Sequence, residues 1–230
     1  MRMIDIVIII PALNEENAVG EVLKEIPKEL VSEIVVVDNN SKDETAITAS
    51  AQGATVLFEN RQGYGWACLK AIEYFEKKEK QPDIVVFMDA DHSDFPEQLP
   101  ELIKPIIDSD FDMVIGSRSL GQRESASMTP QQIFGNWLAT FLIRLFYRVK
   151  FTDLGPFRAI KFDKLLQLKM SDKTYGWTVE MQVKAVKMGF KCCEIPVNYR
   201  RRIGFSKVSG TLKGTIGAGY RILLTVFRYI

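Results

Sequence analysis

Short apolar runs alternate with helix-patterned segments along the first half of the chain. Five runs rich in β-branched residues end at polar or turn-forming residues and predict strands at 6–10, 34–37, 54–58, 84–88 and 113–115. Between them, apolar residues recur three and four positions apart, which predicts helices at 18–30, 44–52, 66–78 and 96–107. Strand and helix therefore alternate through this half.

The predicted strands are continuously apolar rather than alternating between apolar and polar residues. This pattern is typical of parallel strands covered by helices on both faces, so it predicts an α/β fold with a mostly parallel, Rossmann-like sheet. Ligands of such sheets bind at the carboxyl ends of the strands. Four strands are followed there by polar clusters, which we expect to converge, although ordinary polar turns are the alternative for any one of them. The clusters are Asn14-Glu15, Asp38-Asn39, Asp89–Asp91 and Ser117-Arg118.

The second half is patterned differently, with helices predicted at 133–149, 178–188 and 212–230 and a strand at 195–199. Segments 133–149 and 212–230 are apolar and carry arginines, among them Arg144 and Arg148. Such helices suit a membrane interface, with internal core packing or a homodimer contact as the alternatives. No apolar run reaches the length of about 18 residues that a membrane-spanning helix needs.

Composition narrows the class of protein. The chain has 230 residues, 47% of them hydrophobic, and a net charge of +1, which suits one globular domain and argues against a nucleic-acid partner. The basic run 200–202 is a local candidate for an anion site. Three cysteines without CxxC spacing, and the single histidine His92, argue for a reducing, cytoplasmic compartment and against structural zinc.

Six segments resemble family 2 glycosyltransferases of the GT-A fold, and most closely their dolichyl- or polyprenyl-phosphate mannose or glucose synthase branch. Their order and spacing carry the resemblance over nearly the whole chain. It implies one domain, 1–230, with a nucleotide-sugar-binding half (1–118) and an acceptor-binding half (119–230). The segments are IPALNEE (10–16), VVVDNNSKDET (35–45), FMDADHSDFPEQLP (87–100), VIGSR (114–118), TDLGPFRA (152–159) and YRRRIGFSKVSGT (199–211).

The acidic turn after the fourth strand carries the expected metal chemistry. Residues two apart in an extended turn can face the same way, so Asp89 and Asp91 can share one cation. The resemblance implies that this D-x-D holds Mg²⁺ or Mn²⁺, which stabilises the departing diphosphate. Ser93 stands where the branch has a glutamine able to bind the metal, so the third ligand stays open. A solvated acidic turn is the alternative.

The resemblance also implies the residues that contact the donor. Asp38 would accept hydrogen bonds from base or ribose, with helix capping as the alternative role. Gly63 would let the backbone approach phosphate or sugar, with a plain helix start as the alternative. The whole expected donor-binding set is Pro11, Leu13, Glu15, Asp38, Asn40, Gly63, Asp89, Ala90, Asp91, Arg118, Arg201 and Lys207.

Four further residues are expected at the catalytic centre beside Asp89 and Asp91. By the same resemblance, Arg118 would lie near the donor diphosphate or the acceptor phosphate. Arg201 would help to neutralise the leaving diphosphate, with a solvated basic loop as the alternative for 200–202. Asp153 or Glu180 would remove the proton of a hydroxyl acceptor. A phosphate acceptor is already an anion, needs no strong base, and would be positioned by arginines.

The leading hypothesis is inverting transfer of a hexose from a GDP-mannose- or UDP-glucose-type donor to a polyprenyl or dolichyl phosphate. The protein would act as a peripheral protein on the inner face of the membrane. The nearest alternative has the same donor and a hydroxyl acceptor. A nucleotidyltransferase would need a basic, glycine-rich segment after the first strand, which IPALNEE lacks, and a non-catalytic nucleotide-sugar binder would not need Asp89 and Asp91.

Overall fold

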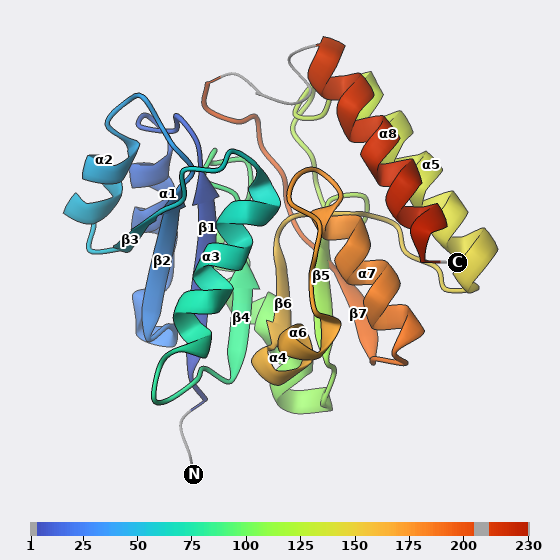
Figure 1. The fold of residues 1–230 in the computed structure, drawn as a ribbon, viewed down its shortest axis with the longest axis horizontal. Coiled ribbons are helices and arrows are strands. Elements are labelled where there is room, and N and C mark those ends of the chain that lie inside the picture. Colours follow the sequence, from blue (N-terminus) through green and yellow to red (C-terminus); the bar gives the residue numbers. More distant parts are fainter. Residues whose placement is uncertain (1–3, 205–211, 230) are drawn as a thin grey trace.

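A seven-stranded mixed sheet forms the centre of the molecule (Figure 1). The computed structural model describes residues 4–204 and 212–229. The strands are β1 (Ile6–Ala12), β2 (Glu33–Asp38), β3 (Thr55–Phe58), β4 (Ile84–Phe87), β5 (Met113–Ser117), β6 (Arg158–Lys161) and β7 (Cys192–Pro196). The α-helices are α1 (Val19–Glu25), α2 (Thr45–Ala51), α3 (Tyr64–Glu76), α4 (Leu99–Ser109), α5 (Pro130–Tyr147), α6 (Phe162–Leu168), α7 (Trp177–Lys187) and α8 (Leu212–Arg228). Two short 3₁₀ helices, η1 (Lys28–Leu30) and η2 (Pro96–Gln98), complete the described elements.

The sheet has the order β3-β2-β1-β4-β6-β5-β7 and confirms the predicted α/β class with a mostly parallel sheet. Only β6 runs antiparallel to its neighbours, with Ala159 opposite Val86 of β4 and Val114 of β5. Sequence analysis missed β6 and the helix α6 that follows it. The strand is only four residues long and has a charged residue at each end, so it lacks the apolar run that identifies the other strands.

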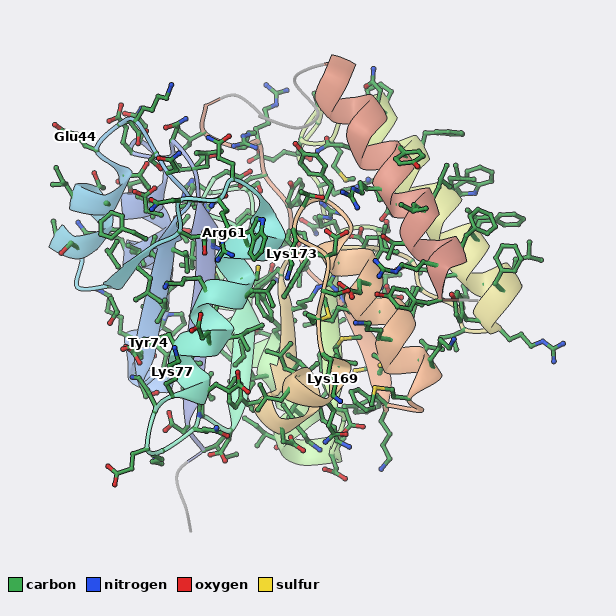
Figure 2. The ribbon with its side chains drawn as sticks, viewed as in Figure 1. Glu44, Arg61, Tyr74, Lys77, Lys169 and Lys173 are labelled. Atoms are coloured by element: carbon green, nitrogen blue, oxygen red, sulfur yellow. The ribbon has the colours of Figure 1, made fainter. Side chains whose placement is uncertain are left out.

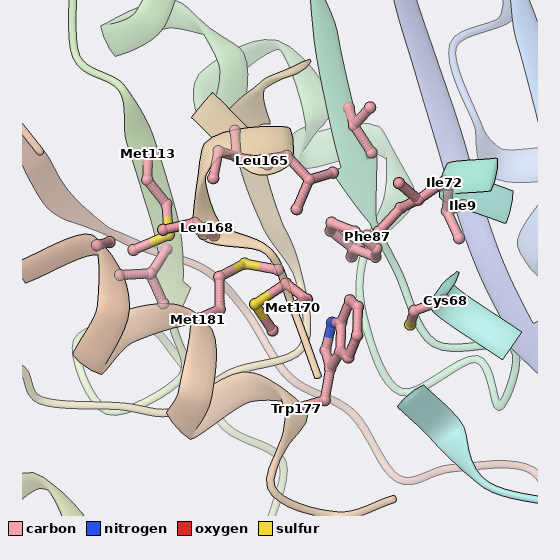
Figure 3. Close-up of a cluster of buried hydrophobic side chains, with 14 of the residues drawn as sticks. Ile9, Cys68, Ile72, Phe87, Met113, Leu165, Leu168, Met170, Trp177 and Met181 are labelled. Atoms are coloured by element: carbon pink, nitrogen blue, oxygen red, sulfur yellow. The ribbon is translucent and has the colours of Figure 1, made fainter. Parts of the chain in front are cut away.

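Successive strand residues point to opposite faces, and a helical layer covers each face. Ile9, Val37 and Phe87 pack under α3, α6 and α7, whereas Ile8 and Val36 pack against α1 and α4. On the first face, the ring of Trp177 from α7 lies edge-on to Phe87, with their centroids 6.1 Å apart (Figure 3). Burial on both faces explains why the strands are continuously apolar.

Three predicted boundaries are shifted for local reasons. The helix expected at 18–30 ends at Glu25, because Ile26 precedes Pro27 and is held in an extended conformation. The last strand lies at Cys192–Pro196 instead of 195–199, because Cys193 pairs with Val114 while the residues after Pro196 leave the sheet. The helix α5 starts at Pro130, where Thr129 and Gln132 form a reciprocal capping box.

One edge of the sheet gathers the loops that sequence analysis expected to converge. The carboxyl ends of β1, β2, β4, β5 and β7 lie there because these strands are parallel. The reversed direction of β6 brings the preceding loop, 152–157, to the same edge. Residues from both halves of the chain therefore meet at one site.

Helices α5 and α8 lie side by side outside the sheet (Figure 1). The Tyr147 hydroxyl donates to the Val226 carbonyl at 2.7 Å, and the rings of Phe146 and Phe227 lie 5.4 Å apart. Among the described helices, none is both long and apolar enough to cross a bilayer.

Candidate active site

The acidic turn Asp89-Ala90-Asp91 directly follows β4 and is fixed by its own neighbours. Asp91 Oδ1 accepts hydrogen bonds from the Ser93 amide at 3.0 Å and from Ser93 Oγ at 2.5 Å. Ser93 is fully buried, so its hydroxyl holds Asp91 in place. His92 points away from the turn, and its Nε2 lies 3.0 Å from Glu25 Oε1 of α1. These contacts fix the conformation of the turn that carries the two carboxylates.

Three buried carboxylates, those of Asp89, Asp91 and Asp94, concentrate negative charge at this turn. Burial, and then the charges of Asp91 and Asp94, raise the pKa of Asp89 well above its ordinary value. Burial and Asp91 raise the pKa of Asp94 to about 7. The Oδ1 atoms of Asp89 and Asp94 are both buried without a hydrogen-bond partner among the described residues. Buried, unpartnered carboxylate oxygens are what a bound cation would satisfy.

These oxygens fit a hard divalent cation such as Mg²⁺ or Mn²⁺. The described residues do not bring three acidic, histidine or cysteine ligands together as a complete cage. A cation held by Asp89 and Asp91 would therefore take its remaining ligands from substrate or water, as is usual for Mg²⁺ beside phosphates. The assignment of Asp89 and Asp91 as ligands stays a prediction. Ser93 is engaged with Asp91 and is not turned outward as a third ligand.

The segment 197–204 crosses the acidic turn and places one arginine against it. The Arg202 guanidinium lies between two carboxylates, with Nη1 2.9 Å from Asp91 Oδ2 and Nη2 2.7 Å from Glu15 Oε1. The Ile203 amide donates to the Asp91 carbonyl at 2.9 Å, which fixes the crossing point. Arg202 thus joins the loop after β1 to the loop after β4.

Sequence analysis selected Arg201, whose side chain the structure places elsewhere. It is exposed, and its Nε donates to the Ser125 carbonyl at 2.7 Å. Arg200 is also turned aside, pairing with Glu25 of α1. Adjacent residues of an extended segment face opposite ways, but nothing in a run of three arginines tells which one faces the acid. Lys207 lies outside the described residues.

Arg118 is held at the site by Asp153. Its Nε and Nη2 donate to the two carboxylate oxygens at 2.8 and 2.7 Å, and its backbone amide adds a third hydrogen bond at 2.7 Å. Burial alone would raise the pKa of Asp153, but the charge and hydrogen bonds of Arg118 outweigh it, so this pKa is lowered. Asp153, expected as a base, accepts all three of these hydrogen bonds and so orients Arg118.

The Glu180 carboxylate is likewise engaged by hydrogen bonds and an ion pair with neighbouring residues. Its carboxylate accepts from the Ser171 hydroxyl at 2.6 Å, from the Asp172 amide at 2.6 Å and from the Tyr229 hydroxyl at 2.8 Å. Lys184 Nζ lies 2.6 Å away. Burial raises the pKa of Glu180, but these partners outweigh it and the pKa is lowered. The carboxylate ties α7 to the 171–172 turn and to the end of the chain, which does not suit a base open to an acceptor.

Several predicted nucleotide-binding residues lie in the neighbouring loops at the carboxyl ends of β1 and β2. The pairing of β1 with β2 sets Pro11 opposite Val37, and in the loop that follows Leu13 the Glu15 amide donates to Thr45 Oγ1 at 2.8 Å. Asp38 Oδ1 accepts from the Ser41 amide at 2.9 Å, so it closes a turn instead of capping α2. Asn40 is exposed and has left-handed backbone geometry, with φ of 67°. Contact of these residues with a donor stays a prediction.

Asn39 and Gly63 organise the neighbouring loop, 59–63. Asn39 Nδ2 donates to the carbonyls of Glu59 and Arg61 at 3.0 and 2.8 Å, and Asn39 Oδ1 accepts from the Gly63 amide at 2.7 Å. Gly63 has φ of 147°, and a Cβ there would lie 2.2 Å from the Lys173 carbonyl oxygen. Glycine is therefore required for close packing, and the Gly63 amide is already engaged by Asn39.

A cationic pair flanks Trp66 at the same end of α3, a feature that sequence analysis did not single out. The Arg61 guanidinium lies 3.6 Å and Lys173 Nζ 4.4 Å from the ring centroid of Trp66. Figure 2 labels Arg61 and Lys173. Arg61 also donates to both oxygens of Glu59, and these hydrogen bonds lower the pKa of Glu59 to about 2. The stack fixes the 59–63 loop against the 172–174 turn.

Replacing Asn39 by aspartate should destabilise this loop. A carboxylate cannot donate to the two carbonyls, which would leave buried acceptors facing a negative charge and cost about 1–3 kcal/mol. Urea unfolding of Asn39→Asp measures the loss. The matched control is Asn40→Asp at the exposed neighbouring position, and an equal loss in both variants would contradict the role given to Asn39.

A comparison with known proteins identifies the family. The model of glycosyl transferase family 2 matches residues 7–168. The chain belongs to this family. It is 34% identical, over 92% of its length and 93% of the relative's, to an uncharacterized glycosyltransferase of Mycobacterium tuberculosis. It is 31% identical to a dolichyl-phosphate hexose transferase of Haloferax volcanii (89% and 86% covered) and 29% identical to an undecaprenyl-phosphate mannosyltransferase of Micrococcus luteus (90% and 88% covered).

Solved structures agree with the fold of this family 2 glycosyltransferase. Glucosyl-3-phosphoglycerate synthase of Mycobacterium tuberculosis, solved with Mn²⁺, UDP and phosphoglyceric acid, aligns with a TM-score of 0.77 at 21% identity. The alignment covers 98% of this chain and 78% of that one. This alignment confirms the expected GT-A fold, and the family match confirms the glycosyltransferase class.

Proposed function

We propose that this glycosyltransferase moves a hexose, with inversion, from a GDP-mannose- or UDP-glucose-type donor to a polyprenyl phosphate, with Mg²⁺ or Mn²⁺ bound. Two relatives that cover most of the chain are named for polyprenyl-phosphate acceptors, which supports this acceptor class. The solved neighbour bound to Mn²⁺ and UDP supports a divalent cation and a nucleotide-sugar donor.

The choice of acceptor rests on one observation: both expected bases, Asp153 and Glu180, are already engaged by other residues. Asp153 is paired with Arg118, and Glu180 is enclosed by Ser171, Asp172, Lys184 and Tyr229. A hydroxyl acceptor needs a carboxylate within reach of its proton. A phosphate acceptor brings its own negative oxygen and needs cationic groups to position it. A fixed arginine, with both expected bases engaged by other side chains, favours the phosphate.

Each residue then has a physical task in the transfer. When bound, the cation neutralises charge on the departing diphosphate, and Asp89 and Asp91 would hold it. Asp153 keeps the Arg118 guanidinium oriented, so that positive charge is in place before negative charge develops. Glu15 and Asp38 lie on the rim where the nucleoside would bind. Ser93 prevents Asp91 from rotating out of position.

An aromatic and cationic face suits a site at an anionic lipid surface. Phe134, Trp137 and Phe141 of α5 are 61%, 57% and 49% exposed, and successive rings lie 5.8 Å apart. On α8, Tyr220 and Phe227 are 65% and 52% exposed. The sequence from 126 to 152 contains no acidic residue and includes Arg144 and Arg148, both exposed. Positive charge beside exposed rings complements negative phospholipids.

Removing rings from this face should weaken binding to vesicles that contain anionic phospholipid. Each buried aromatic ring contributes about 1.5 kcal/mol or more, so Trp137→Ser is expected to lower partitioning about tenfold in a sedimentation assay. Phe58→Ser is the matched control, because Phe58 is 64% exposed on the edge strand β3. Equal binding by both variants, with loss of a dimer in Trp137→Ser, would assign this face to a second copy of the chain instead.

An acceptor panel tests the proposed function. Labelled GDP-mannose and UDP-glucose are each offered with Mn²⁺ and with a polyprenyl phosphate, the corresponding polyprenol or 3-phosphoglycerate. Label should enter only the polyprenyl phosphate, from one of the two donors. Transfer to the polyprenol would favour the hydroxyl-acceptor alternative, and transfer to 3-phosphoglycerate would favour a soluble phosphorylated acceptor.

A further inference from the structure

Both oxygens of the Asp91 carboxylate are engaged by the protein itself. Oδ1 accepts from the amide and hydroxyl of Ser93, and Oδ2 lies 2.9 Å from Arg202 Nη1. The Asp91 side chain is 10% exposed and that of Arg202 25% exposed, so the pair is mostly screened from solvent. An ion pair in this setting is held more strongly than one on the open surface.

The second contact of Arg202 makes the arrangement a bridge. Arg202 Nη2 lies 2.7 Å from Glu15 Oε1, whose side chain is 9% exposed. Glu15 comes from the loop after β1 and Asp91 from the loop after β4, so one guanidinium neutralises charge from two loops. Backbone hydrogen bonds from Ile203 to the Asp91 carbonyl and from Arg200 to the Ser93 carbonyl pin the segment over the turn.

We propose that Arg202 and the divalent cation compete for Asp91, so that the protein carries its own substitute cation when no donor is bound. The proposal rests on the metal role given to Asp91 above. A cation that takes Oδ2 of Asp91 must displace the guanidinium. The donor diphosphate offers the displaced guanidinium a new anionic partner, so cation and donor bind cooperatively, while the cation alone binds weakly.

The expected change in cation affinity depends on the fraction of donor-free molecules in which Arg202 bridges Asp91 and Glu15. If Arg202 bridges the carboxylates in about 90% of donor-free molecules, the apparent affinity for the cation falls about tenfold. Removing the guanidinium should restore that affinity. Arg201 provides the matched control, because it carries the same charge one residue away and donates to the Ser125 carbonyl instead.

Mn²⁺ binding, followed by the electron paramagnetic resonance signal of the free ion, tests the competition without an activity assay. In the absence of nucleotide, Arg202→Gln should bind Mn²⁺ about tenfold more tightly than the parent protein, and Arg201→Gln within about twofold of it. Arg202→Lys, which keeps the charge but cannot span both carboxylates, should fall between them. Thermal unfolding confirms that each variant is folded.

Two results would overturn the proposal. Unchanged or weaker Mn²⁺ binding by Arg202→Gln would show that the bridge does not compete, and equal tightening in Arg201→Gln would show only a general effect of charge. A parallel titration of the parent protein with Mn²⁺, in the presence of GDP or of UDP, tests the metal assignment separately from the competition. Failure of Mn²⁺ to bind even with nucleotide would count against the proposed function. Nucleotide-dependent Mn²⁺ binding that Arg202→Gln leaves unchanged would refute only the competition.

Discussion

Asp89→Asn is expected to reduce hexose transfer by about 10²–10³-fold while leaving the fold as stable as the parent or slightly more stable. The loss of activity follows because a neutral amide holds a divalent cation poorly and the leaving diphosphate loses stabilisation. The stability follows from the electrostatics of the turn, because burial and the charges of Asp91 and Asp94 disfavour the Asp89 carboxylate. An isosteric neutral side chain removes that penalty.

The two effects are measured separately. Initial rates of transfer at saturating Mn²⁺ give the activity, and thermal unfolding in chelator gives the stability of the metal-free protein. The control is Asp83→Asn, which lies before β4 at the opposite edge of the sheet. A variant that loses activity only because it unfolds, or one that keeps nearly full activity, would contradict the role given to Asp89.

Asp153→Ala is expected to lower the free energy of unfolding by about 3–5 kcal/mol and to abolish transfer. The substitution leaves the buried guanidinium of Arg118 without its two carboxylate hydrogen bonds, and an uncompensated buried charge costs about that much. Urea denaturation measures the loss. Asp110→Asn is the control, because Asp110 is 78% exposed, its pair with Lys161 should contribute nothing measurable, and asparagine tolerates the left-handed backbone there (φ of 56°).

The variant Asp153→Asn distinguishes a role of Asp153 in orienting Arg118 from a role as the catalytic base. The amide can still accept one hydrogen bond from Arg118, so some folded protein with residual activity is expected. If Asp153 orients Arg118, the remaining activity should keep the pH profile of the parent. Disappearance of the acidic limb of the profile would mean that Asp153 exchanges a proton with the acceptor, and the hydroxyl-acceptor alternative would regain its support.

Sequence patterns were sufficient for the elements that depend on local signals. The continuous apolar runs of β1, β2, β4 and β5 predicted a covered, mostly parallel sheet, and the polar clusters at their carboxyl ends do lie along one edge. The strand β6 could not be found this way, because Arg158–Lys161 is held in the sheet by pairing with β4 and β5 and carries no apolar run of its own.

The roles of charged side chains depended on partners far away in the sequence. Asp153 looked like a base until the fold set it against Arg118, 35 residues earlier. Arg201 and Arg202 are equivalent by composition, and only the direction of the segment over the acidic turn separates them. Asn39 stood out in the sequence only as part of a polar cluster, and the fold shows that it holds the 59–63 loop through hydrogen bonds to its backbone. Motifs predicted the candidate site, and tertiary contacts determine the partner of each charged side chain within it.

We propose that cation-dependent sugar transfer to a lipid phosphate takes place at Asp89 and Asp91. The most direct measurement is mass spectrometry of the organic phase after incubation of the protein with donor and polyprenyl phosphate, with Mn²⁺ or with excess chelator. A hexosyl polyprenyl phosphate should form with Mn²⁺, and neither chelator-treated protein nor Asp89→Asn should yield more than about a hundredth of it. Equal product in the presence of chelator, or undiminished product from Asp89→Asn, would contradict the account.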